Sequence, residues 1–184
     1  MTVEGQEAEW VRRSRGGDAQ AFGQLVERYQ RRLLTAVTRS VGRQAVAEDI
    51  VQEAFVRAFE AIDRFQERSR FYTWLYRIAF NLVASRHRRD RRTSNPGGPV
   101  PLEEVEASEA VNPRAQAEAE ERRQRVQHAI GELSETFRLP LVLREIEGMN
   151  YQEIGEVLRL PVGTVKSRIH RARMELRDRL RGLL

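Results

Sequence analysis

The chain has 184 residues, a formal net charge of +5 and no cysteine, and 40% of its residues are hydrophobic. This length and apolar content suit one domain or two small ones with real cores. No apolar run is long enough to cross a bilayer and the polar start lacks a secretory segment, so we expect a cytoplasmic protein. Scattered histidines and the lack of a nucleophile with a neighbouring base, a phosphate loop or a carboxylate pair predict no metal, no cofactor and no catalysis.

The charge is unevenly distributed along the chain. Residues 1–92 hold 18 arginines and 12 acids, residues 93–121 hold one arginine and 7 glutamates, and residues 122–184 hold 13 basic and 8 acidic residues. Two basic blocks thus flank an acidic strip that contains four of the six prolines. This pattern predicts two nucleic-acid-binding domains, residues 1–92 and 122–184, on a linker that a polyanion would repel.

The first block begins with two predicted helices. Asp18 can cap a helix that ends near Gly42, and the pattern over residues 44–62 is a clean amphipathic helix. The outer face of this second helix is acidic with an apolar centre: Asp49, Gln52, Glu53, Val56 and Glu60. Such a face is either simply solvated or a docking surface for a basic protein partner.

Residues 63–81 carry six of the 13 aromatic residues together with arginines. A helix from about Phe71 would place one apolar stripe in the core: Phe71, Leu75, Ile78 and Leu82. The opposite side would present Tyr76 and Phe80 with Arg77, next to a polar loop over residues 66–70 and before the basic tail of residues 86–92. Exposed aromatics stack on bases and arginines pair with phosphates, so this side suits an unpaired strand. The alternative is that Tyr76 and Phe80 pack against another helix of the same bundle.

The second block predicts a helix-turn-helix. One helix ends near Leu133, and Ser134 can cap another that reaches Glu147, with a kink or a late start at Pro140. Asn150, with a glutamate three residues later, predicts a capping box that opens a short helix. Residues 160–163 break that helix and a basic helix starts at Thr164.

Three motifs now resemble a bacterial sigma factor of the extracytoplasmic-function (group IV) type in the sigma-70 family. AEDIVQEAFVRAF resembles the polymerase-binding helix of region 2, FYTWLYRIAFNLV resembles the promoter-melting helix, and LPLVLREIEGMNYQEIGEVLRLPVGTVKSRIHRAR resembles region 4. The resemblance implies an all-α fold of two small helical domains, regions 2 and 4, joined by a flexible linker. It also implies a factor that directs core RNA polymerase to promoters and that an anti-sigma factor holds inactive.

Together with the helix faces above, the resemblance predicts three sets of site residues. Core polymerase would bind Asp49, Gln52, Glu53 and Val56. The unpaired minus-ten strand would contact Phe65, Arg68, Ser69, Phe71, Tyr76, Arg77 and Asn81. The double-stranded minus-thirty-five element would contact Thr164, Lys166, Ser167, Arg168, His170 and Arg171.

Two departures from the family bear on promoter choice. Many relatives have arginine at the position of Lys166, so a forked guanine contact becomes a point-charge contact and the preferred base is open. The tryptophan pair of primary sigma factors is missing, which in the family goes with stringent promoters. The competing interpretations are a freestanding helix-turn-helix regulator with a sensing or dimerising bundle and a nucleoid protein held by charge.

Overall fold

The computed structural model describes residues 3–92 and 113–181, and these form helices and turns without a strand. The helices are α1 (Val3–Arg15), α2 (Ala19–Val41), α3 (Gln44–Ala61), a short 3-10 helix (Ile62–Arg64), α4 (Phe71–Arg92), α5 (Pro113–Gly131), α6 (Glu135–Glu145), α7 (Tyr151–Leu158) and α8 (Val162–Leu180). The all-α fold class is confirmed for the described residues. Most of the predicted linker, residues 93–112, lies outside them.

Helix α2 begins and ends where the sequence predicts. The carboxylate of Asp18 accepts hydrogen bonds from the backbone N–H groups of Gln20 and Ala21, both at 3.0 Å. The bond from Ala21, followed by the bond from Arg13, lowers the pKa of Asp18. At the other end Gly42 adopts a φ of 74°, and its N–H returns to a carbonyl of the last turn. A left-handed residue of this kind is a common helix stop.

Helix α1 was not predicted. Its sequence is largely polar, and Val11 is its one apolar side chain that is fully buried among those described. Val11 and the partly buried Trp10 pack against the core, and polar contacts add to this packing: Arg13 pairs with Asp18 at 2.6 Å, and the hydroxyl of Tyr29 donates to Glu7. A hydrophobic periodicity search misses such a helix because its face contributes little to the core.

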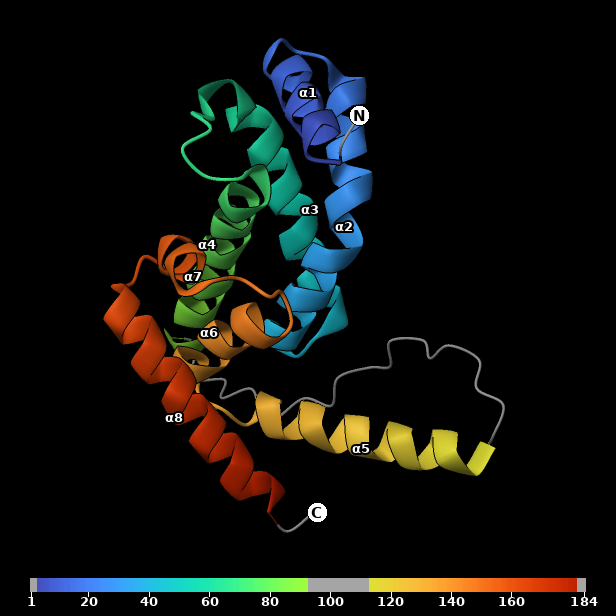
Figure 1. The fold of residues 1–184 in the computed structure, drawn as a ribbon, viewed down its shortest axis with the longest axis vertical. Coiled ribbons are helices and arrows are strands. Elements are labelled where there is room, and N and C mark those ends of the chain that lie inside the picture. The colour runs from blue at the N-terminus through green and yellow to red at the C-terminus, as the bar shows by residue number, and fades with distance from the viewer. Residues whose placement is uncertain (1–2, 93–112, 182–184) are drawn as a thin grey trace.

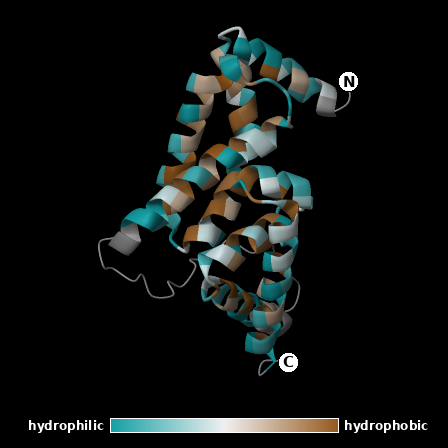
Figure 2. Ribbon diagram, turned by 90° about the vertical axis from the view of Figure 1, so that its left-hand side faces the viewer, coloured by the Kyte–Doolittle hydropathy of each residue, from teal (hydrophilic) through white to brown (hydrophobic). Residues whose placement is uncertain are grey.

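Helix α3 confirms the predicted amphipathic pattern. Its inward residues are buried: Ala47, Ile50, Val51, Ala54, Phe55 and Ala58. The predicted core stripe of α4 is only half right, because Phe71 and Leu75 are buried whereas Ile78 and Leu82 are partly exposed. In Figure 2 the apolar segments gather where neighbouring helices face one another.

The second bundle consists of α5 to α8. Helix α5 begins at Pro113, so residues 113–121, predicted as linker, are helical. Helix α6 starts at Glu135 and runs through Pro140, so a late start at the proline is wrong. Ser134 precedes α6 as predicted but makes no side-chain cap bond.

The helix-turn-helix is confirmed, with a capping box at its start. Asn150 accepts the N–H groups of Gln152 and Glu153 at 2.9 and 3.0 Å, and the carboxylate of Glu153 accepts the N–H of Asn150 at 2.8 Å. Helix α7 stops at Arg159, which has a φ of 55°, and α8 begins at Val162 rather than at Thr164. The short break between them fixes how α8 is presented.

The two bundles pack against each other. Helix α7 lies along α4, while α6 and α5 lie near the lower end of α2 (Figure 1). One apolar cluster runs through both bundles and includes Leu33 and Phe80 of the first with Leu143 and Ile154 of the second. The sequence leaves the arrangement of the two domains open, and the structure shows that α4 is covered by the second bundle.

Candidate nucleic-acid interface

The predicted polymerase-binding face of α3 is exposed. All four predicted residues are exposed, and Val56 reaches 51% exposure: Asp49, Gln52, Glu53 and Val56. Glu53 also pairs with Arg57 one turn later, at 2.5 Å. The structure thus leaves this face open to a partner, and its role stays a prediction.

The polar loop before α4 is held at both ends by aromatic rings. Phe65 and Phe71 are buried, with ring centroids 6.0 Å apart, and the ring of Phe65 lies 5.0 Å from that of Trp74. Between them Glu67 has a φ of 54° and pairs with Arg15 of α1 at 2.8 Å. Phe65 and Phe71, predicted as strand contacts, therefore shape the loop from inside. The exposed residues that the loop offers include Arg68.

A hollow of about 760 Å³ opens beside this loop. Its walls come from α1, α2, the loop, the start of α4 and the turn between α6 and α7. The lining holds four arginines, four aromatic rings and three glutamates: Arg28, Arg32, Arg68, Arg70, Tyr29, Phe65, Phe71, Tyr72, Glu7, Glu67 and Glu147. Arginines that bind phosphate, together with rings on which bases stack, are what single-stranded nucleic acid requires. Arg68 and the adjacent Ser69, which line the hollow, were predicted from the sequence as contacts of the unpaired strand. The α2 side of the hollow and Tyr72 were missed.

The outward placement of Tyr76 and Phe80 is wrong for this structure. Tyr76 is 0% and Phe80 is 2% exposed, and their rings stack at a centroid distance of 6.1 Å. The predicted alternative, packing within the same bundle, is incomplete, because helix α7 of the second bundle lies along this face of α4. Arg77 and Asn81, on the margins of the face, remain partly exposed.

A carboxylate of the second bundle closes the face. Glu147, in the turn between α6 and α7, has a side chain only 2% exposed and pairs with Nε of Arg32 at 2.7 Å. The hydroxyl of Tyr76 donates to the same carboxylate at 2.6 Å. Burial, followed by the charge of Glu147, raises the pKa of Tyr76, so this hydroxyl stays a donor. Nearby, Tyr72 donates to Glu153 at the start of α7, and burial raises the pKa of Tyr72 to about 12.

The predicted minus-thirty-five residues lie on α8, and four of the six are exposed: Lys166, Ser167, His170 and Arg171. Thr164 is partly buried, and Ser167 donates to its carbonyl at 3.0 Å. Arg168 is also partly buried and lines a recess of about 290 Å³ with Phe80 and Asn81 of α4. Four of the six side chains are thus available to a DNA groove, whereas Arg168 faces the first bundle.

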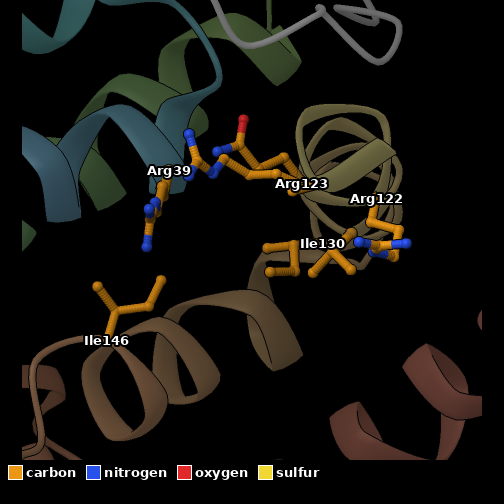
Figure 3. A pocket seen from close by; sticks show the side chains of 8 residues that line it. Arg39, Arg122, Arg123, Ile130 and Ile146 are labelled. Atoms are coloured by element: carbon orange, nitrogen blue, oxygen red, sulfur yellow. The ribbon is translucent and has the colours of Figure 1, made fainter. Parts of the chain in front are cut away.

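A separate apolar recess of about 400 Å³ lies between α2, α5 and the end of α6 (Figure 3). Val126 and Ile130 of α5 and Ile146 line it, with Arg39 and Arg123 among the charged residues. None of the predicted site residues lines this recess. It marks the second place, after the α4–α7 contact, at which the two bundles meet.

No group of three or more histidine, aspartate or glutamate side chains within residues 3–92 and 113–181 is arranged to hold a metal ion. In the same part of the chain no helix combines the length and the apolar character needed to span a membrane.

Comparison with known proteins identifies the family. The Sigma-70 region 2 model matches residues 25–93, and the Sigma-70, region 4 model matches residues 123–176. The chain is 39% identical to the RNA polymerase sigma-H factor of Pseudomonas aeruginosa, over 100% of this chain and 98% of that protein. It is 40% identical to the ECF RNA polymerase sigma-E factor of Escherichia coli K12, over 95% of this chain and 94% of that protein.

A solved structure shares the arrangement over both bundles. The sigma factor RpoE in complex with the anti-sigma factor NepR from Bartonella quintana has a TM-score of 0.69 at 26% identity, covering 89% of this chain and 98% of that one. The chain belongs to the sigma-70 family, as one of its extracytoplasmic-function factors. Promoter-specific sigma activity is thus favoured over a freestanding regulator.

Proposed function

We propose that three surfaces of this chain divide the work of promoter recognition. The outer face of α3 binds core RNA polymerase in the cytoplasm, α8 reads the double-stranded minus-thirty-five element, and the loop before α4 holds the unpaired minus-ten strand. The chain performs no chemical step of its own, and an anti-sigma factor regulates it. These residue roles follow the family resemblance, and the geometry of the described residues supports them.

The observation that carries the proposal is the hollow beside the loop. Arg68 lies at its edge on a segment that the buried rings of Phe65 and Phe71 hold in place. A fixed loop presents its arginine without a large entropy cost on binding, which suits capture of a strand only after base pairs open.

The test uses the full chain with core polymerase and a promoter selected in vitro from random DNA. Arg68→Ala should bind polymerase normally and lose open complex on duplex DNA, but lose far less on a template pre-melted by mismatches at minus ten. If Arg68 contacts a phosphate, the salt dependence of strand binding should also fall by a slope of about 1.

The matched control is Arg64→Ala. Arg64 lies just before the loop, its side chain is 87% exposed, and it does not line the hollow. This variant should behave like the parent on both templates. Selective DNA binding by the chain without polymerase, together with equal behaviour of Arg64→Ala and Arg68→Ala, would instead support the freestanding regulator.

A further inference from the structure

We propose that Arg32 and the hydroxyls of Tyr72 and Tyr76 form an anion site for the backbone of the unpaired strand, and that two carboxylates of the second bundle occupy this site in the closed chain. Glu147 covers Arg32 and Tyr76, and Glu153 covers Tyr72. The inference rests on the proposed function, because it assigns Arg32 and Tyr72, which line the same hollow, and Tyr76, which is buried behind Glu147, to strand binding. It also makes strand capture and closure of the two bundles mutually exclusive.

The contacts of Glu147 lead to this assignment. The side chain accepts from Nε of Arg32 at 2.7 Å and from the hydroxyl of Tyr76 at 2.6 Å, both in the first bundle. A second guanidinium nitrogen of Arg32 donates to the backbone carbonyl of Glu147 at 2.5 Å. Among the side chains that the structure describes, Glu147 is the one buried charged residue. A buried carboxylate is costly without charged or hydrogen-bonding partners, so Glu147 depends on this site.

The donors around Glu147 are those that suit a phosphate. A guanidinium fork and hydroxyl groups bind the oxygens of carboxylates and phosphates alike. The guanidinium of Arg32 also lies 5.9 Å from the centre of the Tyr72 ring, which places a flat ring beside the charge. Tyr72 in turn donates to Glu153, so two carboxylates of the second bundle engage hydroxyls of α4.

The position of Glu147 in the hollow means that Glu147 and a bound strand would compete for the same arginine. Glu147 and Gly148 form one wall of the same hollow that Arg28, Arg32 and Arg68 line. Arg32, whose side chain is 49% exposed, is thus shared between the closing contact and the open space. A strand that used Arg32 would have to displace Glu147 and with it the turn between α6 and α7.

The turn holds Glu147 firmly in place. The N–H of Glu147 bonds to the carbonyl of Val142 at 3.3 Å, and the N–H of Met149 bonds to the carbonyl of Leu143 at 3.1 Å. Gly148 between them has a φ of 65°, a conformation that glycine adopts without strain. Arg32 also donates to the backbone carbonyl of Glu147, and the turn is fixed to the buried end of α6. A strand that takes both contacts of Arg32 would therefore have to move the turn, and with it the second bundle, and not only the carboxylate side chain.

The first measurement is binding of the full chain to a fluorescent single-stranded oligonucleotide that carries the minus-ten strand of the selected promoter. Glu147→Gln removes the charge with little change of shape, and should raise strand affinity on the order of tenfold, since it loses a charged hydrogen bond that holds the closed state. Arg32→Ala should lower strand affinity. Combining both changes should leave no gain from Glu147→Gln.

The matched control is Glu145→Gln. Glu145 precedes the turn, its side chain is 48% exposed, and it pairs with Arg173 of its own bundle at 2.5 Å. This variant should bind the oligonucleotide like the parent. Thermal unfolding of each variant identifies any that fails to fold. Arg32→Lys keeps the positive charge but not the forked guanidinium, so its strand affinity tests whether the fork itself is required.

The second measurement is the distance between the two bundles. The chain has no cysteine, so spin labels can be placed on exposed sites of the two bundles, such as Glu60→Cys and Arg177→Cys. Both Glu147→Gln and addition of the oligonucleotide to the parent should shift the label distance to larger values.

The possible results distinguish this inference from the proposed function. If neither the parent nor Glu147→Gln binds the oligonucleotide, this inference is refuted, whereas the proposed function is tested separately by the holoenzyme assay with Arg68→Ala. If the parent binds but Glu147→Gln and Glu145→Gln have the same affinity, or the strand leaves the label distance unchanged, the inference alone is refuted.

Discussion

Replacing Gly155 with alanine should destabilise the second bundle, because this glycine lies where α7 approaches the turn before α8. A Cβ at Gly155 would lie 2.8 Å from the carbonyl oxygen of Leu160 and 3.9 Å from the side chain of Val162. The first distance is well inside normal contact, and a backbone oxygen cannot rotate away. Moving Leu160 would also disturb its 2.9 Å hydrogen bond to the carbonyl of Gly155.

Two opposing effects set the magnitude. Alanine is favoured over glycine inside a helix by about 1 kcal/mol, whereas inserting a methyl group into a packed site costs about 1–3 kcal/mol. Since the obstructing atom at Gly155 belongs to the backbone, we expect the upper part of this range and a net loss of about 1–2 kcal/mol. The measurement is urea unfolding of the full chain followed by circular dichroism, together with binding of the holoenzyme to minus-thirty-five duplex DNA, which should weaken.

The control is Gly23→Ala. Gly23 lies inside α2, and a methyl group at this position would meet no atom within 4 Å. The same exchange there should therefore stabilise the chain by up to about 1 kcal/mol. If Gly155→Ala unfolds at the same urea concentration as Gly23→Ala, or at a higher one, then the close approach of Leu160 does not constrain the turn and the reasoning is wrong.

Three further substitutions test the core, the cap and the reading helix. Leu75→Ala should lower the free energy of unfolding in urea by about 2–5 kcal/mol because Leu75 is fully buried. Val56→Ala, at a side chain that is 51% exposed in the parent, should lower it far less. Similar losses for the two variants would contradict the assignment of Leu75 to the core. Asn150→Ala should cost about 1 kcal/mol in the same assay, and an unchanged midpoint would mean that the capping box contributes nothing. Arg171→Ala should weaken holoenzyme binding to the preferred minus-thirty-five element by about 1–3 kcal/mol, and an equal loss on scrambled DNA would reassign Arg171 to phosphate.

The elements that the sequence predicts well are those with local determinants. Asp18 and Asn150 mark helix starts because their side chains bond to backbone groups two and three residues away, whatever the rest of the chain does. The apolar face of α3 follows from a periodicity that is complete within one helix. The exposed face of α3 and most of the α8 surface were predicted for the same reason.

The parts that the sequence does not predict depend on distant partners. Helix α1 has little apolar surface, and its contacts with Tyr29 and Glu67 are visible only in three dimensions. Arg32 is one arginine among 31 in the sequence, and its place in the hollow depends on how α2 meets the loop and the turn at Glu147. No local pattern distinguishes it from the solvated arginines near it in α2.

Tyr76 shows why a helical projection alone cannot decide what a face does. The projection places Tyr76 outside the apolar stripe that holds Leu75, about 100° further around the helix. It predicts exposure because a helix that packs on a single bundle has one inner and one outer side. The structure instead has α4 between two bundles, with Leu75 in the core of the first and Tyr76 bonded to Glu147 of the second. A face that is buried by a separate domain is a face that opens when that domain moves. Burial of Tyr76 in the closed chain is therefore compatible with strand binding in the open one, and the charge on Glu147 is the feature that should control which of the two states is populated.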